Sequence, residues 1–168
     1  MPTLILARHA KAEAPAPGLH DIDRALALIG RKASQRLGEA LVEAGLTPDA
    51  ALVSPATRTQ QTWKLMSGAI PGCESRTVES LYETHVPGVI EVLRGLNSES
   101  MVVVVGHEPT SSATAAHLAG PGSDKASLQR VALGLSTATA AVLEFDGAWS
   151  ELDSRGARLT AVVSGRDV

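Results

Sequence analysis

The sequence has very few aromatic side chains. Trp, Tyr and Phe make up 2% of its 168 residues, at Trp63, Tyr82, Phe145 and Trp149. Any hydrophobic core must therefore be built mainly from Ala, Val, Leu and Ile, and Ala alone fills 26 positions. Because single-stranded nucleic acid is bound by stacking its bases on exposed rings, this composition argues against that function.

Positive charge and cysteine are also scarce. Fifteen Lys and Arg residues against eighteen Asp and Glu residues give a net charge of −3, so we expect no nucleic-acid partner. The single Cys73 excludes an intramolecular disulfide and a zinc site with several thiolate ligands. Eleven of the fifteen cationic residues are Arg, which fits either biased base composition or bidentate binding of oxyanions.

Long apolar runs are absent as well. No stretch approaches the length of about 18 apolar residues that a membrane-spanning helix needs, and the N-terminus lacks the basic region of a signal peptide. We therefore expect a cytoplasmic protein without a membrane partner. Since a domain averages about 150 residues, the length predicts a single domain over residues 1–168.

Strand-like and helix-like segments alternate along the chain. Apolar runs predict buried strands at residues 3–7, 50–53 and 101–105, and a short extended segment at 76–81. Helical spacing and capping signals predict helices at residues 33–44, 57–66 and 87–96, and a small-residue helix between Pro109 and Ala119. This alternation predicts an α/β fold with three layers, α/β/α, around a mainly parallel central sheet.

The C-terminal part gives weaker signals. The segment 126–135 fits either a helix or a strand. Residues 138–145 are rich in β-formers, and the turn pair Asp146-Gly147 predicts a C-terminal β-hairpin with residues 148–152. A last apolar run at 159–163 is a candidate for one further strand.

Histidine and arginine follow three of the predicted strands directly. Arg8 and His9 end the first strand, Arg58 begins the helix after the second, and His107 follows the Val-rich strand. Each could have a structural role on its own. Because ligands bind outside the carboxyl ends of parallel strands, however, we expect these side chains to converge. Two guanidinium groups and two imidazoles suit a phosphoryl dianion, without a metal or other cofactor, and an imidazole is the best nucleophile present.

Four motifs occur in order along the first 120 residues. They are Leu6–Ala10, Asp23–Gly30, Ser54–Thr62 and Val105–Pro109. In these motifs the chain resembles the histidine phosphatase superfamily, also called the phosphoglycerate mutase-like superfamily. Segment 143–149 looks like the final hairpin of its small SixA-type phosphohistidine phosphatases.

The resemblance implies a phosphoglycerate mutase-like fold and a metal-independent phosphatase. By this resemblance His9 would carry the phosphoryl group in a covalent intermediate. Arg8, Arg58 and His107 would bind the phosphoryl oxygens, and the backbone N–H of Glu108 would add a donor. Free phosphate or sulfate would bind in the same pocket.

The general acid and the substrate stay open in the sequence. Glu83 has the spacing of the acid in mutase-like members, yet it reads equally well as an exposed side chain. An alkoxide leaving group needs an acid, whereas imidazole, with a pKa near 6.5, leaves with little help. The chain has little length for a lid, which favours a phosphorylated protein of the histidine phosphotransfer type as substrate.

Two alternatives remain, a phosphatase acting on small phosphomonoesters and an inactive member that only binds phosphorylated partners. For an active enzyme, we expect activity to change between pH 5 and 8, falling at low pH as His9 becomes protonated.

Overall fold

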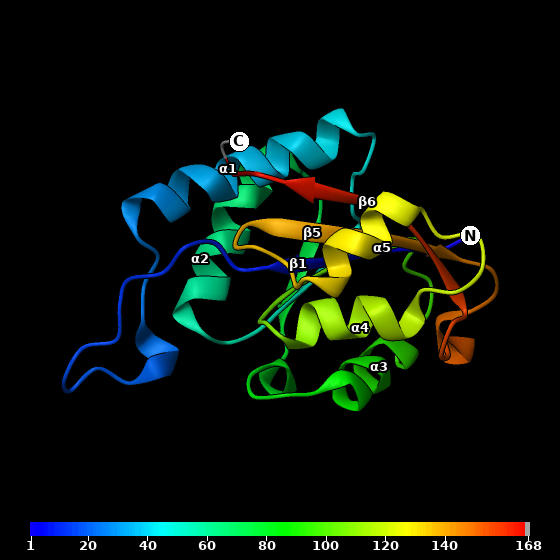
Figure 1. Cartoon of the computed structure of the whole chain (residues 1–168). Helices are drawn as coiled ribbons and strands as arrows, with labels where there is room; N and C mark the ends of the chain where they lie inside the picture. The colour runs from blue at the N-terminus through cyan, green and yellow to red at the C-terminus, as the bar shows by residue number, and fades with distance from the viewer. Residues whose placement is uncertain (167–168) are drawn as a thin grey trace.

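The structure, a computed structural model, describes residues 1–166 and contains one mixed sheet with helices on both faces (Figure 1). The strands are β1 (Thr3–Arg8), β2 (Ala50–Val53), β3 (Glu74–Thr77), β4 (Met101–Gly106), β5 (Thr139–Phe145) and β6 (Ala157–Ser164). The helices are α1 (Leu28–Glu43), α2 (Thr57–Met66), α3 (Val86–Arg94), α4 (Thr110–Leu118) and α5 (Lys125–Ala132). Short 3-10 turns are η1 (Asp21–Asp23), η2 (Ser67–Ala69), η3 (Glu79–Leu81) and η4 (Trp149–Glu151). The three-layer α/β fold predicted from the sequence is confirmed.

Strand alternation divides the core between the two faces of the sheet. Successive side chains of a strand point to opposite faces. Ile5 and Val103 therefore pack in a cluster with α1 and α2, whereas Leu4 and Val104 pack in a second cluster with α3, α4 and α5. Figure 1 shows α1 and α2 on one side of the sheet and α3 and α4 on the other. Both faces of the central strands are covered, which explains their nearly continuous apolar sequences.

The strand order is β3-β2-β4-β1-β5-β6. Strands β1 to β4 are mutually parallel, β5 is antiparallel to β1, and β6 is antiparallel to β5. Because two reversals restore the direction, β6 runs the same way as β1. The carboxyl ends of β1, β2, β4 and β6 therefore lie at one edge of the sheet. The four residues of β3, at the lateral border, are all exposed.

The C-terminal hairpin is confirmed, but its second strand differs from the prediction. β5 pairs with β6 at Ala157–Ser164, and the segment predicted as a strand at 148–152 forms η4. The reason is Trp149, whose side chain is 1% exposed and packs edge-on against Phe145. Its indole N–H donates to the carbonyl of Glu99 at 2.7 Å. This burial turns the segment into the core, and the candidate strand at 159–163 takes its place.

Three other segments differ from the sequence prediction or complete it. α1 begins at Leu28, before the predicted start at residue 33. The prediction started late because Leu28 and Ile29 are exposed and do not continue the apolar periodicity of the helix. The open segment 126–135 is mainly helical, since α5 begins one residue before it, at Lys125, and ends at Ala132; its N-cap Asp124 accepts from the Ser127 N–H. The predicted extended segment 76–81 is divided between the end of β3 and η3. Within residues 1–166, no helix combines the length and apolar character needed to cross a membrane.

Candidate active site

The residues that follow β1, β2 and β4 lie side by side at one edge of the sheet. Arg8 pairs in register with Gly106, and the His9 N–H donates to the Gly106 carbonyl at 3.1 Å. The Ser54 N–H donates to the carbonyl of Val105, also at 3.1 Å. The hydrogen bonds of the sheet thus continue one residue past the ends of β1 and β2. They fix the start of the loops that carry the polar side chains.

The two imidazoles face each other with defined tautomers. The ring centroids of His9 and His107 are 5.5 Å apart. Nδ1 of His9 lies 2.8 Å from the carbonyl of Ala10, and since a carbonyl only accepts, Nδ1 carries the proton and Nε2 has the free lone pair. Nδ1 of His107 lies 3.5 Å from a guanidinium nitrogen of Arg58, which only donates, so His107 donates from Nε2 to Ser54 Oγ at 2.8 Å.

Both histidines are held neutral near pH 7. Burial lowers the pKa of His9 to about 4, and the nearby His107, Arg58 and Arg8 add to this lowering. Burial also lowers the pKa of His107 to about 4, with Arg58 as the next cause, while Asp21 opposes the shift. Neutral imidazoles have lone pairs, so the site can supply a nitrogen nucleophile.

Arg58 is oriented by a carboxylate that the sequence analysis did not identify. Arg58 is buried, with 6% of its surface exposed. Its guanidinium donates to the Asp21 carbonyl at 2.8 Å and to Asp21 Oδ2 at 3.0 Å. The Tyr82 hydroxyl donates to the same Oδ2 at 2.7 Å, and Arg24 donates to Oδ1. The bond from Tyr82, followed by those from Arg58 and Arg24, lowers the pKa of Asp21 to about 2. Asp21 is therefore ionised and fixes the Arg58 guanidinium.

Arg8 is held through the connection between α5 and β5. One of its terminal nitrogens donates to the carbonyl of Leu135 at 2.9 Å. The Leu135 N–H donates to a carboxylate oxygen of Glu108 at 3.0 Å, and Ser112 donates to the same carboxylate from both its N–H and its hydroxyl. The Glu108 side chain thus braces the loop that positions Arg8. Sequence reasoning assigned only the backbone N–H of this residue a role, and that role stays a prediction.

These groups border a cavity of about 260 Å³. Its lining residues are Arg8, His9, Lys11, Ala12, Arg24, Arg58, His107, Glu108 and Thr137. The Nε atoms of Arg8 and Arg58 are buried and have no hydrogen-bond partner within residues 1–166. No group of three or more His, Cys, Asp or Glu side chains in the same range is placed to hold a metal ion. The cavity therefore has the charge and the donors to bind an oxyanion beside the Nε2 lone pair of His9.

Glu83 does not join this cluster. Its side chain is exposed, its φ of 55° lies in the left-handed region, and it is not one of the residues that line the cavity. The neighbouring Tyr82 takes the inward place, with its ring edge-on to His107 at a centroid distance of 5.7 Å. The structure thus brings together Arg8, His9, Arg58 and His107 and leaves Glu83 outside.

Comparison with known proteins gives one consistent family. Residues 4–89 match the model of the histidine phosphatase superfamily, branch 1. The uncharacterized protein Rv1276c of Mycobacterium tuberculosis is 36% identical over 149 residues, which cover 87% of this chain and 91% of that protein.

Two solved structures have similar folds. One is a protein from Nakamurella multipartitia that is provisionally assigned as the phosphohistidine phosphatase SixA. It has a TM-score of 0.81 at 32% identity, and the match covers 96% of this chain and 94% of that chain. The other is a protein from Agrobacterium tumefaciens with the same provisional assignment. It has a TM-score of 0.80 at 28% identity, and the match covers 96% of this chain and 97% of that chain.

Proposed function

Because the chain belongs to the histidine phosphatase superfamily and is of SixA type, we propose that it removes the phosphoryl group from phosphohistidine on a protein partner, through a covalent intermediate on His9. The observation that carries this proposal is the hydrogen bond from His9 Nδ1 to the Ala10 carbonyl. It leaves the Nε2 lone pair at a cavity bordered by Arg8, Arg58 and His107.

The reaction has two displacements at phosphorus. Arg8 and Arg58 bind the phosphoryl oxygens and neutralise their charge, which needs no metal ion. The His9 Nε2 lone pair forms a bond to phosphorus as the bond to the substrate imidazole nitrogen breaks. The substrate ring reacts with a proton on its other nitrogen, so it keeps the electron pair of the broken bond and departs as neutral imidazole. Water then attacks phosphorus and the bond to Nε2 breaks, with its electron pair returning to Nε2. The protons of the water leave with inorganic phosphate, and His9 is again neutral. A bound dianion raises the pKa of His107, which can then donate to a phosphoryl oxygen.

The placement of the carboxylate at the cavity favours phosphohistidine over a phosphate ester. Glu108 is the one carboxylate among the described residues that line the cavity, and its oxygens accept from Ser112 and Leu135. Both oxygens of this carboxylate are engaged by Ser112 and Leu135, so the side chain is held away from the role of donor to an alkoxide. An imidazole leaving group has a pKa near 6.5 and needs little help, so this site suits it better.

Trapping the intermediate tests the proposal. A phosphorylated histidine phosphotransfer domain is mixed with the enzyme, and the intact mass of the enzyme is measured after a rapid alkaline quench. We expect one phosphoryl group on the wild-type chain and none on His9→Ala, with a loss of hydrolysis of at least about a thousandfold. His117→Ala, an exposed histidine on α4, is the matched control and keeps the label. Label that persists in His9→Ala would overturn the mechanism.

A further inference from the structure

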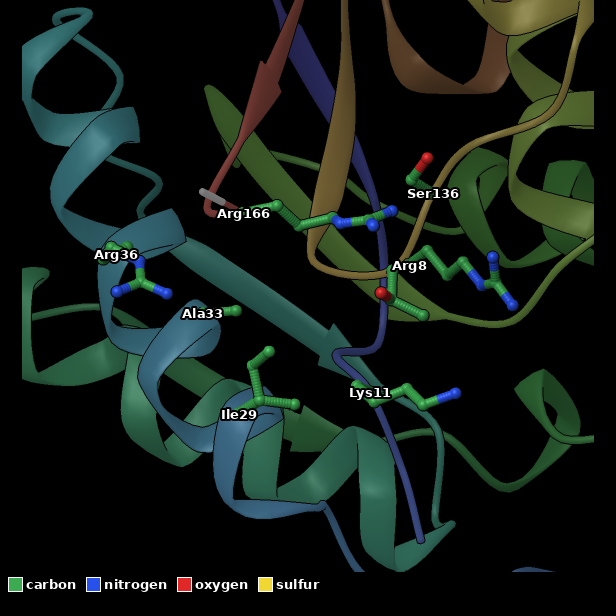
Figure 2. Close-up of a pocket in the computed structure, with 8 residues that line it drawn as sticks. Arg8, Lys11, Ile29, Ala33, Arg36, Ser136 and Arg166 are labelled. Carbon is green, nitrogen blue, oxygen red and sulfur yellow. The ribbon is translucent and has the colours of Figure 1, made fainter. Parts of the chain in front are cut away.

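A second and larger cavity lies beside the first. It has a volume of about 580 Å³ and shares Arg8, Lys11 and Thr137 with the first cavity. Figure 2 shows this cavity between α1 and the ends of β1 and β6. Its lining residues are Arg8, Lys11, Ile29, Ala33, Arg36, Ser136, Thr137 and Arg166.

Arg166 forms part of this cavity because Gly165, directly after β6, packs closely against α1. Because β6 is parallel to β1, its end lies at the same sheet edge as Arg8. The Gly165 N–H donates to the Ala138 carbonyl at 2.8 Å, and the Gly165 carbonyl accepts from Arg36 Nε at 3.0 Å. A Cβ at Gly165 would collide with the backbone of Ala33 on α1, so only glycine allows this approach. The next residue, Arg166, is thereby delivered to the cavity.

The lining of the second cavity is strongly cationic. Arg166 reaches from the end of β6 across the cavity towards Ser136 and Arg8 (Figure 2). With Arg8 and Lys11 it gives the cavity three cationic side chains, beside Arg36, whose Nε is bonded to the Gly165 carbonyl, and no acidic side chain of residues 1–166 lines the cavity. Burial lowers the pKa of Arg8, and the charge of Arg166 lowers it further, while Glu108 opposes both. Gathering like charges in one cavity costs free energy, and a bound anion would offset that cost. The cluster is also local, because the chain as a whole has a net charge of −3.

We propose that this second cavity is an anion subsite for a carboxylate or phosphate group carried by the same substrate whose phosphoryl group reacts at His9. The hydroxyls of Ser136 and Thr137 add hydrogen-bond partners, and Ile29 offers an apolar wall to the atoms that join the two anionic groups. The assignment of the reacting phosphoryl group to the first cavity rests on the proposed function. The affinity of the second cavity for an anion does not. The cavity thus selects substrates with two negative groups, such as a phosphohistidine flanked by acidic side chains or a small bisphosphate.

Non-hydrolysable phosphonates test the subsite independently of turnover. Methylphosphonate has one anionic group, and ω-carboxyalkylphosphonates of increasing methylene number add a carboxylate at increasing reach. Dissociation constants are measured by NMR titration of the full chain. We expect one chain length to bind about fivefold more tightly than methylphosphonate at low salt, as one partly exposed ion pair allows. The gain decreases as salt is added.

Arg166→Gln is the diagnostic variant because Arg166 lines only the second cavity, and its hydrogen bond to Ser164 Oγ comes from the backbone N–H. We expect it to abolish the gain from the carboxylate and to change methylphosphonate binding by less than about twofold, because its charge acts on Arg8 without lining the first cavity. Arg155→Gln removes the same charge from an exposed position just before β6, at the opposite sheet edge, and keeps the gain.

Three results would overturn the subsite. They are no gain at any chain length, a gain that survives Arg166→Gln, and an equal loss of methylphosphonate affinity in that variant. In a parallel titration with α,ω-bisphosphonates, a larger gain than with carboxylates indicates a second phosphate on a small substrate, and a smaller gain indicates acidic side chains of a protein. Because none of these probes is hydrolysed, failure to turn over phosphohistidine refutes the proposed function alone.

Discussion

Asp21 connects three side chains around the site, and its contribution can be measured. It accepts from Arg58, Tyr82 and Arg24, and its own side chain is 52% exposed. We expect Asp21→Asn to lower kcat/KM by about tenfold, because the Arg58 guanidinium loses the charged partner that orients it.

The matched control is Asp23→Asn, an exposed carboxylate in the same 3-10 turn. Steady-state kinetics with a phosphohistidine substrate should show a change below about twofold for this variant. Equal losses in the two variants would show that general charge near the site, rather than the bond to Arg58, is what matters.

Glu83 provides the opposite prediction. Since its side chain is exposed and does not line the cavity, we expect Glu83→Gln to keep kcat/KM for phosphohistidine within about twofold. Hydrolysis of an aryl phosphate, whose leaving group needs little acid, serves as the comparison. A selective loss of about tenfold on alkyl phosphate esters would identify Glu83 as the general acid after all.

The residues of the site divide into those that local sequence can identify and those that it cannot. Arg8, His9 and His107 could be predicted because each directly follows or ends an apolar strand. Asp21 and Tyr82 could not, because they meet Arg58 only after η1 and η3 have folded against α2. A weak signal for Asp21 existed in its place two residues before the motif that starts at Asp23, but spacing alone does not show which cation it reaches.

At the scale of elements, burial overrode turn chemistry once. The Asp146-Gly147 pair correctly marked the end of β5, yet the chain makes η4 before β6 returns. The information needed was that Trp149 packs on Phe145 and bonds the Glu99 carbonyl, a contact 50 residues away. The central strands needed no such information, since buried parallel strands are recognisable from their apolar runs alone.

The packing of α1 on α2 gives a prediction about a glycine. A Cβ at Gly38 would collide with the backbone of Met66, at the end of α2. Alanine normally favours a helix over glycine by about 1 kcal/mol, but here we expect Gly38→Ala to lower the free energy of unfolding by about 1–3 kcal/mol.

Urea denaturation measures this change. Gly68→Ala is the control because nothing lies within 4 Å of the added Cβ. It should leave stability unchanged or raise it by up to about 1 kcal/mol. If both variants behave alike, α1 and α2 are not in the close contact that the structure shows.

At the scale of the whole molecule, the two buried imidazoles make stability depend on pH. The pKa of His9 and that of His107 are about 4 in the folded state, against an ordinary value of 6.5. Between these pH values the unfolded chain binds more protons than the folded chain does. The free energy of unfolding therefore falls as pH decreases from about 6.5 to 4, and these groups cause no change above that range.

Urea denaturation at pH 7.5, 6.5 and 5 checks the sign, and a His9→Gln, His107→Gln double variant should show a flatter dependence. Asp21, with a pKa of about 2 in the folded state, adds to the loss of stability only as the pH falls towards and below its ordinary pKa of 3.8. An unchanged slope in the double variant would contradict this account.

The lowered pKa of His9 also moves the expected loss of kcat/KM in the free enzyme to below about pH 5, which corrects the sequence-based expectation of a change between pH 5 and 8.

The exposed strand β3 has a consequence for the behaviour of the protein at high concentration. A sheet border with free backbone groups is a template for adding a strand from another molecule, which leads to aggregation. Here the border strand has only four residues, two of which, Glu74 and Arg76, are charged. Arg76 also forms an ion pair with Glu99 at 3.3 Å. Shortness and charge, rather than cover by a helix, therefore protect this border against self-association into fibrils.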